Sequence, residues 1–219
     1  MSVDCIAMAG GAQAAAAGKP RTRNARGEGE RLREALMDAA GELLVEGTSA
    51  EALSIRGITA RAGVTPTALY LHFADKQELL QALVARSYEE LLEMLTEAQA
   101  SAPEPREQLK AMALAYITFA LERPQLYRIL FATYIPGSKI MPPGGAPGDP
   151  DPGLSTFELL TQAVARYVGD DRDPFAVAIH LWLELHGFVT LRPVMPAFPL
   201  PDPEQFAEEI AHAHLDKRR

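Results

Sequence analysis

Residues 54–80 read SIRGITARAGVTPTALYLHFADKQELL, and this stretch decides the fold. Its first apolar residues recur at helical spacing up to Gly63, which signals a turn. Thr65 and Pro66 follow with a hydroxyl at the N-cap and a proline at the first helical position, so a second helix begins there. Asp75 and Glu78 match a capping box and open a third helix, which keeps the second helix short.

A helix, a glycine turn and a short helix that starts with small polar residues form a helix-turn-helix. In this motif the second helix lies in the major groove of DNA, and its first turn contacts base edges. Hydroxyl groups can bond bases or phosphates there, and a methyl group can pack on thymine. The second helix is predicted over residues 66–71, and its candidate DNA-contacting residues are Thr65, Pro66, Thr67 and Ala68.

Over residues 31–80 the chain resembles the DNA-binding domain of TetR-type transcriptional regulators. The run A-R-A-G-V-T-P-T-A-L-Y-x-H-F-x-D-K-x-E-L-L carries this resemblance. It implies that Tyr70, His72 and Lys76 contact DNA phosphates, although His72 alone could instead cap the end of its helix. Gly57 departs from the family pattern, since a helix former or an acidic residue is usual there, and glycine costs a helix up to about 1 kcal/mol relative to alanine.

The charge distribution fits a nucleic-acid partner although the net charge is −8. Residues 19–33 carry six basic and two acidic side chains beside the helix-turn-helix, where phosphate neutralisation requires positive charge. We expect residues 1–27 to be a disordered basic arm that follows phosphates or enters the minor groove, although such a tail can also serve solubility alone. Arg31 and Arg56, near the starts of two predicted helices, are further candidate phosphate contacts.

Helical periodicity continues through the rest of the chain, without alternation typical of strands. One helix over residues 76–100 is long enough, at ~1.5 Å per residue, to link two domains. We therefore predict an all-α chain of about nine helices, in which a helix-turn-helix domain (28–75) joins a helical ligand-binding and dimerisation domain (76–219). Residues 135–153 are dense in proline and glycine, and we expect disorder there rather than a lid.

The predicted helix over residues 174–192 is apolar around most of its circumference. One side of such a helix can face the domain core, and the other side then needs a partner. A symmetric homodimer through residues 174–215 would meet that need. The pattern Trp-x-x-x-His-Gly at residues 182–187 also resembles a signature of a large TetR subgroup, over residues 104–215.

Aromatic and polarisable side chains in the C-terminal helices are candidates for the walls of a ligand site. They suit a small apolar or aromatic ligand, although each is also an ordinary core residue. These candidates are Met112, Tyr116, Phe119, Tyr127, Phe131, Phe157, Trp182 and His186.

The sequence contains no pattern typical of a catalytic, cofactor-binding or metal-binding site. The single cysteine excludes an intramolecular disulfide and a cysteine metal cluster. No nucleophile elbow, dinucleotide fingerprint or P-loop occurs, and His212 and His214 diverge by ~200° on a helix, so we expect no enzyme, cofactor or metal site. No run approaches the ~20 apolar residues of a membrane span, and the start lacks a signal-peptide pattern, so we expect a cytoplasmic protein.

The resemblance implies a transcriptional regulator, most often a repressor, that binds a palindromic DNA operator as a homodimer and is released by a small ligand. Two alternatives stay open: a DNA-binding regulator without a ligand, and a helical adaptor that binds proteins through the 174–215 surface. A fully packed C-terminal core would favour the first alternative, and a cavity of several hundred Å³ would favour the ligand sensor. The adaptor predicts no sequence-specific DNA binding.

Overall fold

The computed structural model describes residues 28–131, 152–169 and 172–215, and every regular element in those ranges is an α-helix. The all-α prediction is confirmed. The basic arm and residues 135–151 of the proline- and glycine-rich segment lie outside the described residues. The helices are α1 (Glu28–Val45), α2 (Ile55–Arg61), α3 (Pro66–Leu69), α4 (Lys76–Ala100), α5 (Pro105–Glu122), α6 (Pro124–Phe131), α7 (Pro152–Ala165), α8 (Pro174–Leu191) and α9 (Pro203–Leu215).

The turns before and after α2 form where the sequence predicts them. Gly47 and Gly63 have φ values of 96° and 69°, in the left-handed region that glycine enters without steric cost. Ser54 caps α2, because its Oγ accepts a hydrogen bond from the Gly57 N–H at 3.1 Å. A Cβ added at Gly57 would lie 3.3 Å from that Oγ, so the unexpected glycine makes room for the cap.

The start of α4 carries the predicted carboxylate pair, with one difference. The Asp75 Oδ1 accepts from the Glu78 N–H at 2.9 Å, which is the forward half of a capping box. The return bond goes to Ala74, whose N–H donates to the Glu78 Oε2 at 2.5 Å, rather than to the N–H of Asp75 itself. Both bonds fix the direction in which α4 leaves the N-terminal helices.

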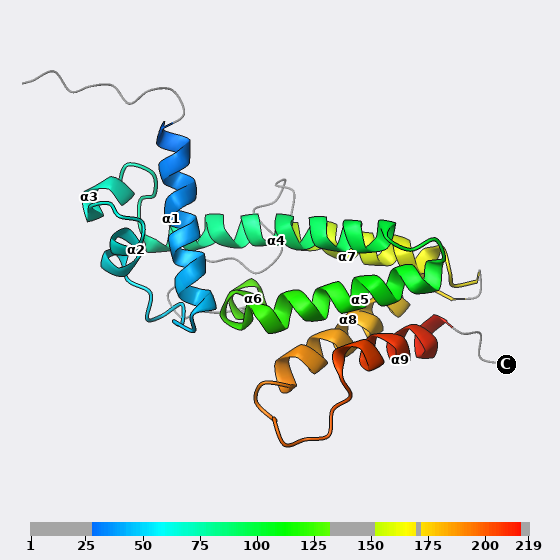
Figure 1. Ribbon diagram of the computed structural model, residues 1–219. Coiled ribbons are helices and arrows are strands. Elements are labelled where there is room, and N and C mark those ends of the chain that lie inside the picture. Colours follow the sequence, from blue (N-terminus) through cyan, green and yellow to red (C-terminus); the bar gives the residue numbers. More distant parts are fainter. Residues whose placement is uncertain (1–27, 132–151, 170–171, 216–219) are drawn as a thin grey trace, which may run out of the picture.

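The long helix α4 connects the two halves of the molecule (Figure 1). It contacts α1 and α6, and it runs beside α5 and α7. Its buried leucines include Leu79, Leu83 and Leu91, which belong to one hydrophobic core that extends from α1 to α9. The N-terminal helices are therefore packed onto the C-terminal ones rather than tethered to them.

The apolar helix α8 is only partly covered. It packs against α5, α7 and α9, with Leu181 and Leu185 buried, whereas Phe175, Leu183 and Leu191 are about half exposed. Its 18 residues have a mean hydropathy of 1.3, so by length and composition it could cross a membrane. Core helices of soluble proteins can have the same length and hydropathy. The helices α5, α7 and α9 cover only one side of α8.

Candidate nucleic-acid interface and ligand cavity

The short helix α3 is held by buried side chains at its C-terminal end. Leu69 and Phe73 are 0% and 2% exposed, and α3 lies at the outer edge of the N-terminal group of helices (Figure 1). Its first turn therefore faces outward. The exposed side chains on and next to α3 are those of Thr65, Pro66, Thr67 and Tyr70, and Ala68 is half-buried.

Thr65 occupies the predicted N-cap position of α3, but its hydroxyl does not cap the helix. The backbone there is extended, with φ −81° and ψ 152°, and Pro66 takes the first helical position. Because an N-cap threonine usually bonds a backbone N–H of the first turn, this hydroxyl keeps its hydrogen-bonding capacity for an outside partner.

The arginines around α3 differ in how far their charge is already neutralised. Arg61 pairs with Glu46 at 2.6 Å and Glu42 at 3.1 Å, and the hydrogen bonds with these carboxylates raise the pKa of Arg61. Arg31 and Arg56 are exposed and make no ion pair within the described residues. Of these three, Arg31 and Arg56 therefore carry the uncompensated charge that a phosphate backbone attracts.

Lys76 is partly engaged inside the protein. Its Nζ donates to the carbonyl oxygens of Leu53 at 2.8 Å, Ala50 at 3.2 Å and Glu51 at 3.4 Å. The ammonium group therefore ties the start of α4 to the turn before α2. This contact was not foreseen from the sequence, and the phosphate role of Lys76 stays a prediction, as does that of the half-buried His72.

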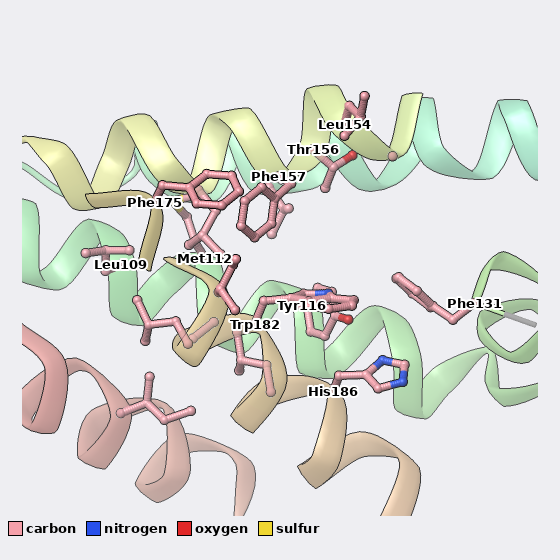
Figure 2. Close-up of a pocket in the computed structure, with 18 of the residues that line it drawn as sticks. Leu109, Met112, Tyr116, Phe131, Leu154, Thr156, Phe157, Phe175, Trp182 and His186 are labelled. Atoms are coloured by element: carbon pink, nitrogen blue, oxygen red, sulfur yellow. The ribbon is translucent and has the colours of Figure 1, made fainter. Parts of the chain in front are cut away.

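A cavity of about 540 Å³ lies among α4, α5, α7, α8 and α9 (Figure 2). Two lining residues, Leu154 and Phe175, are more than half exposed, so the cavity reaches the surface between α7 and α8. Sequence reasoning missed both, together with Leu160 and Ile179, although the apolar pattern of their helices was visible. The predicted ligand-site residues on the wall are Met112, Tyr116, Phe131, Phe157, Trp182 and His186.

Two predicted wall residues are placed elsewhere. Phe119 is 1% exposed and packs beneath the guanidinium of Arg123, 5.2 Å from its ring centroid, so it belongs to the core. Tyr127 does not line the cavity either. Its hydroxyl instead bonds the hydroxyl of Tyr116 at 2.7 Å and the Nδ1 of His186 at 2.6 Å, behind the wall.

The described residues that line the cavity carry no formal charge. None of the described lining residues is a lysine, arginine, aspartate or glutamate. Burial raises the pKa of Tyr116 and of Tyr127, so both phenols stay protonated, and burial lowers the pKa of His186, which favours neutral imidazole. The cavity is thus an apolar space with a few neutral polar groups.

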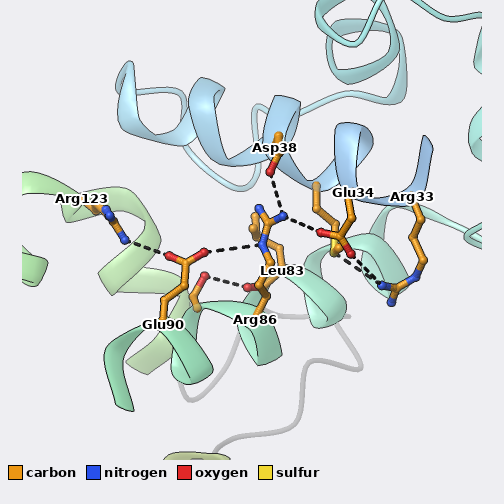
Figure 3. Close-up of polar contacts among 9 residues, drawn as sticks. Arg33, Glu34, Asp38, Leu83, Arg86, Glu90 and Arg123 are labelled. Atoms are coloured by element: carbon orange, nitrogen blue, oxygen red, sulfur yellow. Dashed lines mark hydrogen bonds and ion pairs between the residues drawn. The ribbon is translucent and has the colours of Figure 1, made fainter. Parts of the chain in front are cut away.

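A network of ion pairs joins α4 to α1 and to Arg123, just before α6 (Figure 3). On α4, the Arg86 Nη1 lies 2.8 Å from the Asp38 Oδ1 and 3.0 Å from the Glu34 Oε2, both on α1. Its Nε lies 3.7 Å from Glu90, which pairs with Arg123 at 3.0 Å, just before α6. One turn and a half of α4 therefore contacts α1 and the start of α6.

Two family models match separate parts of the chain. The model for bacterial regulatory proteins of the tetR family covers residues 36–83, and that for the tetracyclin repressor-like C-terminal domain covers residues 109–214. The chain belongs to the TetR family of transcriptional regulators. Helix α3 lies within the first match, and most of the residues that line the cavity lie within the second. The models describe a family of transcriptional regulators.

Two curated relatives are also named as HTH-type transcriptional regulators. The HTH-type transcriptional activator FasR of Mycolicibacterium smegmatis is 31% identical over 119 residues, which cover 52% of this chain and 54% of FasR. The regulator YxbF of Bacillus subtilis is 36% identical over 66 residues, or 30% of this chain and 17% of YxbF. The chain thus matches about half the length of FasR and less of YxbF.

Solved structures share the fold. A protein of unknown function from Rhodococcus sp. RHA1 matches with a TM-score of 0.69 at 22% identity, over 91% of this chain and all of that one. The fatty acid degradation regulator FadR of Bacillus halodurans matches with a TM-score of 0.64 at 15% identity, over 86% and 96% of the two chains. At these identities the likeness extends to the fold alone.

Proposed function

We propose that this TetR-family regulator binds an operator through α3 as a homodimer and is controlled by a small uncharged molecule in its C-terminal cavity. The observation that carries the proposal is the joint presence of an outward-facing α3, which packs against α2, and a cavity of about 540 Å³ that Tyr88 and Leu95 of α4 help to line. Residues 28–75 would read DNA, and residues 76–219 would sense the ligand and dimerise. We infer that it acts in the cytoplasm, where bacterial DNA is accessible.

The proposed DNA contacts divide into two kinds. The first turn of α3 would meet base edges, since it is exposed and ends in hydroxyl and methyl groups. The remaining candidates would meet phosphates and set the orientation of α3. Candidates of the first kind are Thr65, Pro66, Thr67 and Ala68, and those of the second are Arg31, Arg56, Tyr70, His72 and Lys76.

The proposed dimer rests on apolar surface that the chain itself leaves uncovered. Leu183 and Leu191 on α8, with Val194, Met195 and Phe198 after it, are 42% to 70% exposed. Apolar surface of this kind marks interfaces. A symmetric pair joined through residues 174–215 would hold two α3 helices ~34 Å apart, or a multiple of that, and would read a palindrome.

The cavity supports a ligand-controlled regulator over one that acts without a ligand. Its volume is within the range of small-molecule sites, and a packed core would have filled the same space. Tyr88 on the cavity wall lies within one turn of Arg86, which contacts α1, so a ligand that shifts α4 also shifts the reading helices. By linkage, operator DNA must weaken ligand binding by the factor by which the ligand weakens DNA binding.

The direction of regulation depends on what the bound dimer does to transcription. Repression follows if the dimer on its operator blocks transcription and the ligand releases it. The relative FasR carries the name of an activator, whereas the matching C-terminal family model is described as tetracyclin repressor-like. A reporter gene placed behind the selected operator distinguishes them, because deletion of the regulator raises expression if it represses and lowers it if it activates.

Selection of random double-stranded DNA by the purified full chain tests the core of the proposal. We expect enrichment of a palindrome whose half-sites are centred about 10 base pairs, or a multiple, apart. Enrichment of a single half-site would argue against the dimer, and no enrichment at all would favour the protein-binding adaptor. A thermal-shift screen of uncharged metabolites then tests the sensor, since a ligand of the native state raises Tm.

A further inference from the structure

A chain of hydrogen bonds runs behind the cavity wall and ends at one ring on the wall. Tyr116 on α5 and Tyr127 on α6 share a bond of 2.7 Å between their hydroxyls. The Tyr127 hydroxyl also lies 2.6 Å from the Nδ1 of His186 on α8. Trp182, one turn before His186 on α8, lines the same cavity, and its ring centroid lies 5.5 Å from that of His186. Figure 2 shows Tyr116, Trp182 and His186 together at one end of the cavity.

The direction of every proton in this chain follows from the acceptors that the chain offers. A tyrosine hydroxyl can donate one proton and can also accept, whereas a neutral imidazole has one donor and one acceptor nitrogen. The Tyr116 proton goes to the Tyr127 oxygen, since no other described residue offers it an acceptor. The Tyr127 proton in turn goes to His186 Nδ1. The opposite order would leave the buried Tyr116 proton without an acceptor, which native structures avoid.

The last bond decides the tautomer of His186. Because Nδ1 accepts a proton from Tyr127, the neutral ring must carry its own proton on Nε2. Nε2 makes no hydrogen bond to any described residue, and His186 belongs to the cavity lining. The ring therefore keeps an N–H donor on a residue of the cavity lining, whose described members are mostly apolar.

We propose that the Nε2–H of His186 binds a carbonyl-type oxygen of an uncharged, mainly apolar ligand, and that Tyr116 and Tyr127 fix His186 in the donor tautomer. This inference rests on the proposed ligand role of the cavity. An anionic ligand is disfavoured because no lysine or arginine is among the described lining residues, and a cationic one because no aspartate or glutamate is. Tyr127 is thus a positioning residue, acting on the ligand through His186.

The tautomer can be measured without any ligand. In nitrogen-labelled histidine spectra of the full chain at about pH 8, we expect His186 to show a protonated Nε2 and an unprotonated Nδ1. Its signals are assigned by their loss in His186→Gln. In Tyr127→Phe we expect a mixture of the two tautomers. A His186 that carries its proton on Nδ1 in the wild type, or a Tyr127→Phe spectrum without change, would overturn the inference.

Tyr88→Phe is the matched control for Tyr127→Phe. Tyr88 is also a buried tyrosine beside the cavity, and its hydroxyl donates to the Leu130 carbonyl at 2.8 Å, outside the chain that ends at His186. Both variants lose one buried hydroxyl, so both are expected to unfold more easily. Only Tyr127→Phe should change the tautomer, and a similar change in Tyr88→Phe would point to a general loosening of the core.

Binding of three matched probes then tests the ligand class, with Trp182 fluorescence as the readout. The probes are 2-acetylnaphthalene, 2-isopropenylnaphthalene, in which a methylene replaces the carbonyl oxygen, and the 2-naphthoate anion. We expect the ketone to bind roughly fivefold to tenfold more tightly than its hydrocarbon analogue, as one net hydrogen bond allows, and more tightly than the anion. In His186→Phe this preference for the ketone should vanish while the hydrocarbon still binds.

The outcomes separate this inference from the proposed function. Equal binding of ketone and hydrocarbon, or tighter binding of the anion, would overturn the role of His186 and leave a ligand-binding cavity in place. If none of the probes binds, the ligand role and this inference fall together, while sequence-specific DNA binding is unaffected.

Discussion

The side chains of Arg56 and Lys76, two cationic candidates for phosphate contacts, differ in their contacts within the protein, and this difference can be measured. Arg56 is exposed on the first turn of α2 and has no carboxylate partner among the described residues. Arg56→Gln should therefore weaken binding to all DNA sequences alike and make the salt dependence of log K shallower by about one. Titration of a random duplex at several salt concentrations measures both effects, and an unchanged slope would exclude a phosphate contact.

Lys76 should behave differently from Arg56, because its ammonium group also donates to three backbone carbonyls. Lys76→Gln is expected to lower the free energy of unfolding by about 1.5–3 kcal/mol, the range for hydrogen bonds to a charged group. Urea denaturation of the two variants compares them directly. If Lys76→Gln is as stable as Arg56→Gln, the turn before α2 does not depend on that ammonium group.

The imidazole of His186 predicts a pH dependence of stability. Burial lowers its pKa below the usual 6.5, so the unfolded chain binds more protons than the folded one between the two values. The stability that His186 contributes is therefore complete above pH 6.5 and is lost as the pH falls through the lower, folded pKa. The difference in unfolding free energy between wild type and His186→Gln should grow with pH, and a flat difference would contradict burial of a neutral ring.

At the scale of the elements, α4 is the part that couples the two halves. Arg86 links it to Glu34 and Asp38 on α1, and its side chain is 24% exposed. Arg86→Met should lower the free energy of unfolding by about 1 kcal/mol, as for partly exposed ion pairs rather than the larger cost of a fully buried one. Hydrogen exchange should also become faster in α1.

Arg166→Met supplies the control for Arg86→Met. Arg166 is exposed on the turn after α7 and makes no ion pair with a described residue, so its replacement should leave stability and α1 exchange unchanged. Equal effects of the two substitutions would show that the ion pairs of α4 do not hold α1.

The positions of the helices can be predicted from the sequence. The direction in which individual side chains point can be predicted only in part. The long helix, for example, is predicted over residues 76–100 and is found at Lys76–Ala100, because Asp75 caps its start. Phe119 and Tyr127 have the same aromatic character as the wall residues, but lie behind the wall. Which side of a helix meets a cavity depends on how neighbouring helices cross, and one sequence does not reveal those angles.

At the scale of the whole molecule, the exposed apolar side of α8 predicts the assembly. Leu183 and Val45 are 52% and 51% exposed, on α8 and at the end of α1 respectively. Leu183→Arg should convert the dimer into a monomer, because a charge would have to be buried at the interface, and operator affinity should fall with it. Val45→Arg introduces the same charge at a residue with nearly the same exposed fraction, and this variant should remain dimeric.

Light scattering coupled to size-exclusion chromatography gives the mass of each variant. A dimeric Leu183→Arg would place the interface elsewhere, and a monomeric wild type would contradict the proposed reading of palindromes.

The shared core of α1, α4 and the C-terminal helices also bears on protein engineering. A chimaera that grafts the reading helices of this regulator onto the sensing helices of another would expose Leu79, Leu80 and Leu83 to foreign neighbours if the junction lay at the start of α4. A junction further along α4, beyond Arg86, would carry those leucines and the pairs to α1 along with the graft. In a chimaeric biosensor built on this chain, the junction should therefore lie inside α4, beyond Arg86, rather than at its start.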